Sequence, residues 1–161
     1  MLPTCNSFFK VLSSTSSEPA KRFTFTAELL NELDFSEGWE VALCDIQLQK
    51  NKKIMFEANL WVCSDLIEGY QVGNVALPLL RRISTANLKN TVYLTFQDKQ
   101  YMAVCKQPIR AILITIKGAK ERLPNNTSGE QAAREDVLPT SLTLHFRKLA
   151  NGDASPLHTF Y

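Results

Sequence analysis

Apolar and polar residues alternate along much of the chain, which indicates β-strands. The segments 23–29, 92–96, 110–118 and 142–147 each repeat with a period of two residues. That period is typical of a strand with one face in the core and the other in solvent. For the last of these segments we expect an inward set and an outward set, namely Leu142, Leu144 and Phe146 against Thr143, His145 and Arg147.

The stretch GWEVALCDIQLQ, residues 38–49, is apolar at both alternating sets of positions. In an ideal strand Trp39, Val41 and Leu43 share one face, and Ala42, Cys44, Ile46 and Leu48 share the other. A strand that is apolar on both faces is typical of one that is covered on both sides. We therefore expect a neighbouring element or a neighbouring subunit on its second face.

The whole pattern predicts an all-β fold of about eight short strands separated by turn-forming residues. Pro78 cannot donate a ladder hydrogen bond, so it marks a sheet edge or a strand end. Segment 128–138 is a candidate for one short helix, and segment 27–33 is a weaker candidate. Short strands at this spacing are typical of a β-sandwich or barrel. Eight antiparallel strands in two sheets is the number of a jelly roll, although spacing alone leaves other sandwiches open.

The alternating segments also predict the core. We expect the following side chains to be mostly buried: Phe25, Trp39, Val41, Leu43, Leu94, Ile112, Ile114, Leu142, Leu144 and Phe146.

Length and charge narrow the possible classes of protein. A chain of 161 residues suits one domain, which we place at 1–148, followed by a C-terminal tail at 149–161. The net charge of +2 is too balanced to predict binding to nucleic acid by electrostatics. The first ten residues lack a basic region followed by a long apolar stretch, so we expect no secretory signal there.

Reactive residues are sparse and scattered. Cys5, Cys44, Cys63 and Cys105 form no CxxC pair, so we expect no metal site and four reduced thiols. His145 and His158 have no catalytic spacing to a Ser or Cys, and neither a GxGxxG nor a P-loop sequence is present. We therefore expect no enzyme activity, no catalytic residues and no cofactor.

Four segments, in order, resemble the penton, the single jelly-roll minor capsid protein of Polinton/Maverick elements and their adintovirus and adomavirus relatives. They are FTFTAELLNELDFSEGWEVALCDIQLQ, NLWVCSDLIEGYQVGNVALPLLRRI, FQDKQYMAVCKQPIRAILITIKG and LTLHFRK. Together they cover most of residues 23–148. The chain departs from the family in the long loop 119–139, in the tail after Lys148, and at Asn74, where the family often carries an acid after QVG.

The resemblance implies a single jelly-roll β-sandwich and a structural role in a virion. Such a protein forms a homopentamer at the vertex of an icosahedral capsid, and it contacts the neighbouring major capsid protein. A vertex fibre or a host receptor would be a further partner, and sequence-specific binding to nucleic acid is not expected. Synthesis in the host cytoplasm and assembly in the host nucleus follow from the same resemblance. Arg81, Arg82 and Arg147 are our candidates for the subunit interface, because arginine is enriched at interfaces.

Two other functions remain open on the sequence. One is a jelly-roll ligand or lectin that resembles a trimeric cytokine, against which the missing signal segment and the scattered cysteines argue. The other is an intracellular scaffold or binding module domesticated from a mobile element. The mass of the oligomer separates these functions from a penton.

Overall fold

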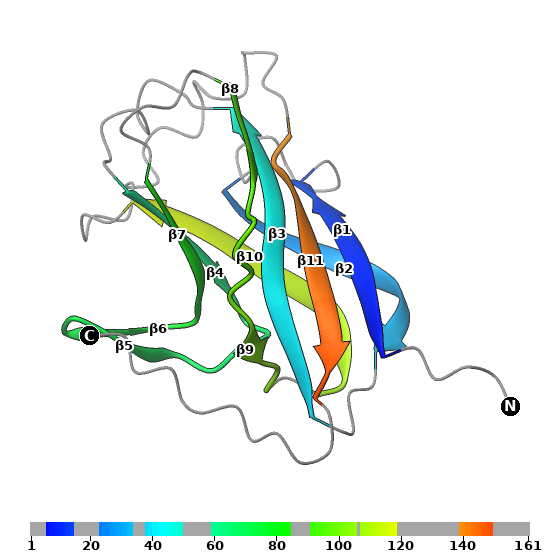
Figure 1. Ribbon diagram of the computed structural model, residues 1–161. Coiled ribbons are helices and arrows are strands. Elements are labelled where there is room, and N and C mark those ends of the chain that lie inside the picture. The colour runs from blue at the N-terminus through cyan, green and yellow to red at the C-terminus, as the bar shows by residue number, and fades with distance from the viewer. Residues whose placement is uncertain are drawn as a thin grey trace, which may run out of the picture.

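The computed structural model describes residues 6–14, 23–33, 38–49, 59–84, 91–105, 107–118 and 139–149. These residues form an all-β structure without an α-helix (Figure 1). The strands, in chain order, are β1 (Ser7–Ser13), β2 (Thr24–Leu33), β3 (Trp39–Gln49), β4 (Asn59–Ser64), β5 (Tyr70–Val72), β6 (Val75–Leu77), β7 (Leu79–Ser84), β8 (Thr91–Thr95), β9 (Met102–Ala103), β10 (Ile109–Gly118) and β11 (Ser141–Lys148). The candidate helix at 128–138, almost all of the loop 119–139 and the tail from residue 150 lie outside the described residues. Nowhere in the described part of the chain is there a helix long and apolar enough to cross a membrane.

Most strands belong to two antiparallel sheets. The first sheet has the order β1-β11-β3-β8, with β9 also paired to β3, and the second has the order β2-β10-β4-β7. Strands β5 and β6 form a separate hairpin. In Figure 1 the first sheet lies in front of the second, with β1 and β2 near the same side. The expected all-β fold of antiparallel strands is confirmed.

One hydrophobic cluster receives side chains from both sheets. Leu142, Leu144 and Phe146 of β11 enter it from the first sheet, and Ile112 and Ile114 of β10 enter it from the second. All five are 0% exposed, as the alternation of these strands predicts. Burying an aliphatic or aromatic side chain of this size contributes about 1.5–3 kcal/mol to folding.

The rest of the expected core follows the same pattern with two partial exceptions. Trp39 and Leu94 are half-buried and pack against the cluster, whereas the other expected core residues are buried. The ring of Phe8 completes this end of the core, since its centroid lies 4.9 Å from that of Phe146 and 5.7 Å from that of Trp39.

Strand β3 contains a β-bulge at Cys44. Leu144 of β11 pairs with Leu43, and the preceding Thr143 pairs with Asp45, so Cys44 is an extra residue on β3. An extra residue shifts the phase of the alternation, and every later side chain then points to the opposite face from the one expected for a regular strand.

The bulge corrects the predicted faces of β3. Val41, Leu43, Ile46 and Leu48 all belong to the same core cluster. The prediction that Ile46 and Leu48 lie on the face opposite Val41 and Leu43 is therefore wrong, because counting residues by two across a bulge reverses the face. The second apolar face of this strand is much smaller than the sequence suggested.

Segment 27–33, the weaker helix candidate, is strand instead. It belongs to β2 and pairs with β10, so tertiary pairing overrides the local helix preference. The pairing shifts register between Ala111, which faces Glu28, and Ile109, which faces Leu33. Leu30 lies within this irregular part of β2 and is 98% exposed.

The β5–β6 hairpin builds a second, smaller cluster against β4 and β7. Cys63, Leu77 and Leu79 are its buried members, and Tyr70 is among the half-buried residues packed against them. The Tyr70 hydroxyl donates to the Leu79 carbonyl at 3.0 Å, which ties β5 to the start of β7. Pro78 lies between β6 and β7, as expected for a strand end, and its carbonyl accepts from the Ser64 N–H at 3.0 Å.

Candidate functional site

A group of polar and aromatic side chains lies on the outer face of the first sheet. Alternation places His145 and Arg147 of β11 on this face, because Leu144 and Phe146 point into the core. Register adds Phe9 of β1, opposite His145, and Glu40 of β3, opposite Arg147. Tyr101 and Lys99 come from the segment between β8 and β9. We call these six residues, Phe9, Glu40, Lys99, Tyr101, His145 and Arg147, the outer-face cluster.

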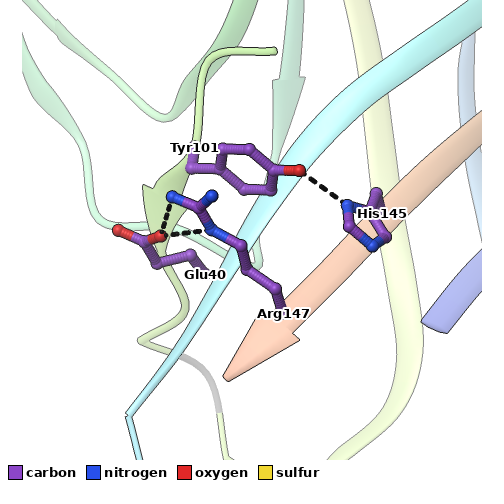
Figure 2. Close-up of polar contacts among 4 residues, drawn as sticks. All are labelled: Glu40, Tyr101, His145 and Arg147. Carbon is purple, nitrogen blue, oxygen red and sulfur yellow. Dashed lines mark hydrogen bonds and ion pairs between the residues drawn. The ribbon is translucent and has the colours of Figure 1, made fainter. Parts of the chain in front are cut away.

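Arg147 and Glu40 form the ion pair of the cluster. The Arg147 Nη2 and Nε atoms lie 2.8 and 2.9 Å from the same Glu40 oxygen, Oε2 (Figure 2). The Glu40 side chain is 6% exposed and that of Arg147 is 45% exposed. A carboxylate that is so deeply buried needs a charged partner, because an unpaired buried charge is costly. Arg147 therefore has a structural role within its own chain.

Tyr101 connects the ion pair to His145. The Arg147 guanidinium carbon lies 3.5 Å from the centroid of the Tyr101 ring, a cation–π contact. The Tyr101 hydroxyl lies 2.6 Å from Nδ1 of His145, so the phenol bridges the two β11 side chains, as Figure 2 shows. The imidazole ring stacks on Phe9, with the ring centroids 4.4 Å apart.

The electrostatics of the cluster favour a neutral His145. Burial lowers the pKa of His145 below its usual 6.5, and the nearby Lys99 and Arg147 cations lower this pKa further. A neutral imidazole offers one nitrogen as an acceptor and one as a donor. In the tautomer that carries its proton on Nε2, Nδ1 accepts the Tyr101 hydroxyl hydrogen.

Titratable groups of the cluster are bonded to one another. Glu40 Oε2 is bonded twice to Arg147, and His145 Nδ1 is bonded to Tyr101. Elsewhere in the described parts of the chain, no group of three or more His, Cys, Asp and Glu side chains is placed to hold a metal ion.

The three arginines that we expected at a subunit interface lie on three different surfaces. Arg147 is on the outer face of the first sheet, as described above. Arg82 pairs with Trp61 on the outer side of the second sheet, is exposed, and donates from Nε to Asn59 Oδ1 at 3.1 Å. Arg81 pairs with the core residue Val62, so the aliphatic part of the Arg81 side chain leaves β7 on its inner side. The structure therefore does not join them into one patch, and their role at an interface stays a prediction.

Arg81 holds the segment that follows β8. Its guanidinium carbon lies 4.1 Å from the centroid of the Phe96 ring, and Nη1 donates to the Asp98 carbonyl. Burial lowers the pKa of Arg81, while the Asp98 carboxylate raises it. Both contacts connect the second sheet to the part of the chain that carries Lys99 and Tyr101. They therefore help to position these two residues of the outer-face cluster.

Three of the four cysteines are described, and all three are free thiols. Burial raises the pKa of Cys44 and of Cys63, which makes both poor nucleophiles. Cys105 is exposed, and its thiol donates to the Leu66 carbonyl at 3.4 Å. Cys5 lies outside the described residues.

Comparison with protein-family models, with curated proteins and with solved structures finds no match to this chain.

Sequence reasoning identified Arg147 but missed its partners. Glu40 has one signal in the sequence, since it is a carboxylate between Trp39 and Val41 in a strongly apolar strand. Such a residue is expected to carry a partner when it is buried. Tyr101 and Phe9 have no comparable signal, because only the pairing of β1 with β11 and the path of the segment before β9 bring them to the same face.

Proposed function

We propose that this chain is a single jelly-roll capsid protein that forms the five-fold vertex, or penton, of an icosahedral virion or virus-like particle. The proposal includes a β-sandwich of eight main strands. It also includes a homopentamer that contacts the surrounding major capsid protein, as well as a location in the virion. A role without catalysis is part of the same proposal.

The nested pairing of the strands is the observation that carries the proposal. With β5–β6 and β9 set aside, the eight strands in chain order pair first with last and then inward: β1 with β11, β2 with β10, β3 with β8, and β4 with β7. This nested set is what results when one long antiparallel hairpin is wrapped into two sheets. Jelly rolls of eight strands, built from two Greek keys, occur in viral capsid and lectin domains.

The remaining elements fit this scheme as local additions. The β5–β6 hairpin lies within the connection from β4 to β7, and β9 pairs with β3, the strand that also pairs with β8. The pairs β11–β3 and β10–β4 then join the four nested pairs into two sheets.

The segments that resemble the penton family correspond to these strands. Residues 23–49 span β2 and β3, residues 59–83 span β4 to most of β7, residues 96–118 include β9 and β10, and residues 142–148 lie in β11. A match in this order and spacing supports a shared topology. Function is proposed from the family resemblance, because a fold alone hosts many functions.

A closed ring of five identical subunits needs two different surfaces that complement each other. Arg82 is exposed and its hydrogen bond is to the neutral Asn59, whereas Arg81 and Arg147 make several contacts within the chain. We therefore propose Arg82 as the interface arginine that is most sensitive to charge reversal.

A ligand or binding module, whether cytokine-like, lectin-like or a domesticated scaffold, is the second candidate. The observation in its favour is the set of large side chains exposed on the outer face of the first sheet. Phe9 is 60% exposed, Val11 is 68% exposed and Tyr93 is 66% exposed. Aromatic side chains of this kind are enriched where proteins bind partners.

The mass of the oligomer tests the proposal. Five copies of an 18.2 kDa chain give about 91 kDa, whereas a cytokine-like trimer gives about 55 kDa. We expect light scattering coupled to gel filtration, at high protein concentration, to give the larger mass for the wild type and a smaller mass for Arg82→Glu. A stable trimer in both proteins would support the ligand instead.

A further inference from the structure

The outer side of β3 is covered by its own chain. Ala42 and Cys44 lie on this side and are 0% and 6% exposed. Ala42 pairs with His145, and the Cys44 thiol lies close enough to His145 to accept its backbone N–H. The Lys99 ammonium is near the same thiol. Lys99 and Tyr101 of the segment 97–101 therefore lie against this side of the strand.

Two kinds of contact hold the segment down. At its start, Arg81 binds the Asp98 carbonyl and Phe96 donates its N–H to the Cys44 carbonyl at 2.8 Å. At its end, the Tyr101 hydroxyl meets His145 Nδ1 at 2.6 Å, the Tyr101 ring lies 3.5 Å from the Arg147 guanidinium carbon, and the His145 ring is stacked on Phe9. The first set has no group that titrates between about pH 5 and 8, whereas the second includes the His145 imidazole.

Positive charges surround His145 more closely than negative ones. Lys99 and Arg147 face the imidazole from the covering segment and from β11, and both disfavour its protonation. On β3, the Glu40 carboxylate is held by Arg147, Asp45 lies next to Cys44, and Cys44 is a neutral thiol. The adjacent residue on β1 is Phe9, which is uncharged. A proton on His145 would thus add a third cation beside those of Lys99 and Arg147.

We propose that His145 is an acid-sensitive latch that holds the segment 97–101 against the outer face of the first sheet. When the imidazole is neutral, Nδ1 accepts the Tyr101 hydroxyl hydrogen and the segment covers Ala42 and Cys44. When acid protonates His145, Nδ1 becomes a donor, the Tyr101 hydroxyl can no longer donate to it, and repulsion between the imidazolium and Lys99 of the segment releases the segment. This inference rests on the geometry of the cluster and does not depend on the capsid proposal.

Thiol labelling measures the opening directly, because Cys44 is beneath the segment. The protein is treated with dithiodipyridine, a reagent that reacts in acid, at about pH 7.5 and about pH 5, and mass spectrometry identifies each labelled cysteine. The exposed Cys105 is the reference. Dividing the extent of labelling at Cys44 by that at Cys105 gives the Cys44 to Cys105 ratio, which removes the pH dependence of the reagent. Cys63, which is 3% exposed beneath the hairpin, reports whether the whole domain opens.

In the wild type, we expect the Cys44 to Cys105 ratio to rise about tenfold or more at the lower pH, with Cys63 unlabelled. In His145→Gln, whose amide oxygen accepts from Tyr101 at every pH, the ratio should stay low. In Tyr101→Phe, which cannot form this hydrogen bond, it should already be raised at neutral pH. The proposal is overturned if the wild-type ratio does not change with pH, if His145→Gln responds equally, or if Cys63 becomes labelled together with Cys44.

Discussion

The contact between Arg147 and Glu40 shows how one buried charge determines the role of a surface residue. Glu40 is nearly inaccessible and accepts two hydrogen bonds from Arg147. An arginine that looks available for a partner subunit in the sequence is thus engaged within its own chain. Arginine suits this position because its planar group pairs with the carboxylate and stacks on Tyr101 at the same time.

Replacing Arg147 with Met should lower the free energy of unfolding by about 1–2 kcal/mol, since Glu40 loses its partner while the exposed half of Arg147 limits the loss. Urea denaturation measures the change. Arg82→Met is the matched control, because Arg82 is exposed and its partner Asn59 is neutral. The double variant Glu40→Gln with Arg147→Met should lose less free energy of unfolding than the sum of the losses in the two single variants. Equal effects of Arg147→Met and Arg82→Met would contradict this role for the ion pair.

The lowered pKa of His145 predicts a dependence of stability on pH. The unfolded chain takes up a proton at His145 as the pH falls through 6.5, whereas the folded protein resists protonation until the pH is lower. The unfolded state then binds more protons than the folded state. The contribution of His145 to the free energy of unfolding therefore decreases as the pH is lowered from 6.5 to the lower pKa of the folded state. Urea unfolding at several pH values in this window should show a larger decrease in the free energy of unfolding for the wild type than for His145→Gln. Parallel curves for the two proteins would rule out the predicted contribution.

At the scale of the strand, the bulge at Cys44 reconciles the apolar pattern of β3 with a single core. Residues before and after the bulge point into one cluster because the extra residue corrects their phase. The sequence does not reveal this bulge, since Cys and Ala are apolar enough to suggest a second buried face. Only the register with β11 shows which residue is the additional one.

Deleting Cys44 should therefore be tolerated better than inserting a residue nearby. Without Cys44, Leu43, Ile46 and Leu48 would alternate regularly toward the core. An Ala inserted between Asp45 and Ile46 would instead turn Ile46 and Leu48 toward solvent. We expect the deletion variant to keep a cooperative thermal unfolding transition and the insertion variant to lose it. The opposite order of stability would show that the bulge does not determine the faces of β3.

The β5–β6 hairpin depends on a glycine at its turn. Gly73 has a φ of 61° at the first central position of a two-residue turn, since Val72 pairs with Val75. A Cβ there would meet nothing within 4 Å, so the cost of a side chain comes from the backbone conformation alone. Gly73→Ala should destabilise the hairpin by about 1–2 kcal/mol and speed hydrogen exchange in residues 70–77. Asn74→Ala, at a residue with negative φ, is the control, and an equal effect of both changes would contradict the account.

The alternating segments predicted the strands well where pairing is regular. The inward and outward sets of β11 and the buried isoleucines of β10 follow directly from a period of two. The prediction failed at β3 and β2, where a bulge or a shift in register breaks that period. The outer-face cluster was predictable at His145 and Arg147, which alternation places outward, but not at Phe9, Glu40 and Tyr101, which reach it through contacts between distant parts of the chain.

At the scale of the whole molecule, eight strands in nested pairs contain most of the residues that the structure describes. Under the capsid proposal, the outer faces and edges of the sheets meet neighbouring subunits and the major capsid protein.

The capsid proposal is tested most directly by assembly with its partner. The chain is co-expressed with a major capsid protein from the same genome, particles are purified, and their vertices are examined by electron cryomicroscopy. We predict five copies of this chain around each five-fold axis, with the strand order described above. Particles that close without this chain, or a chain that is recovered only as a free trimer, would contradict the proposal.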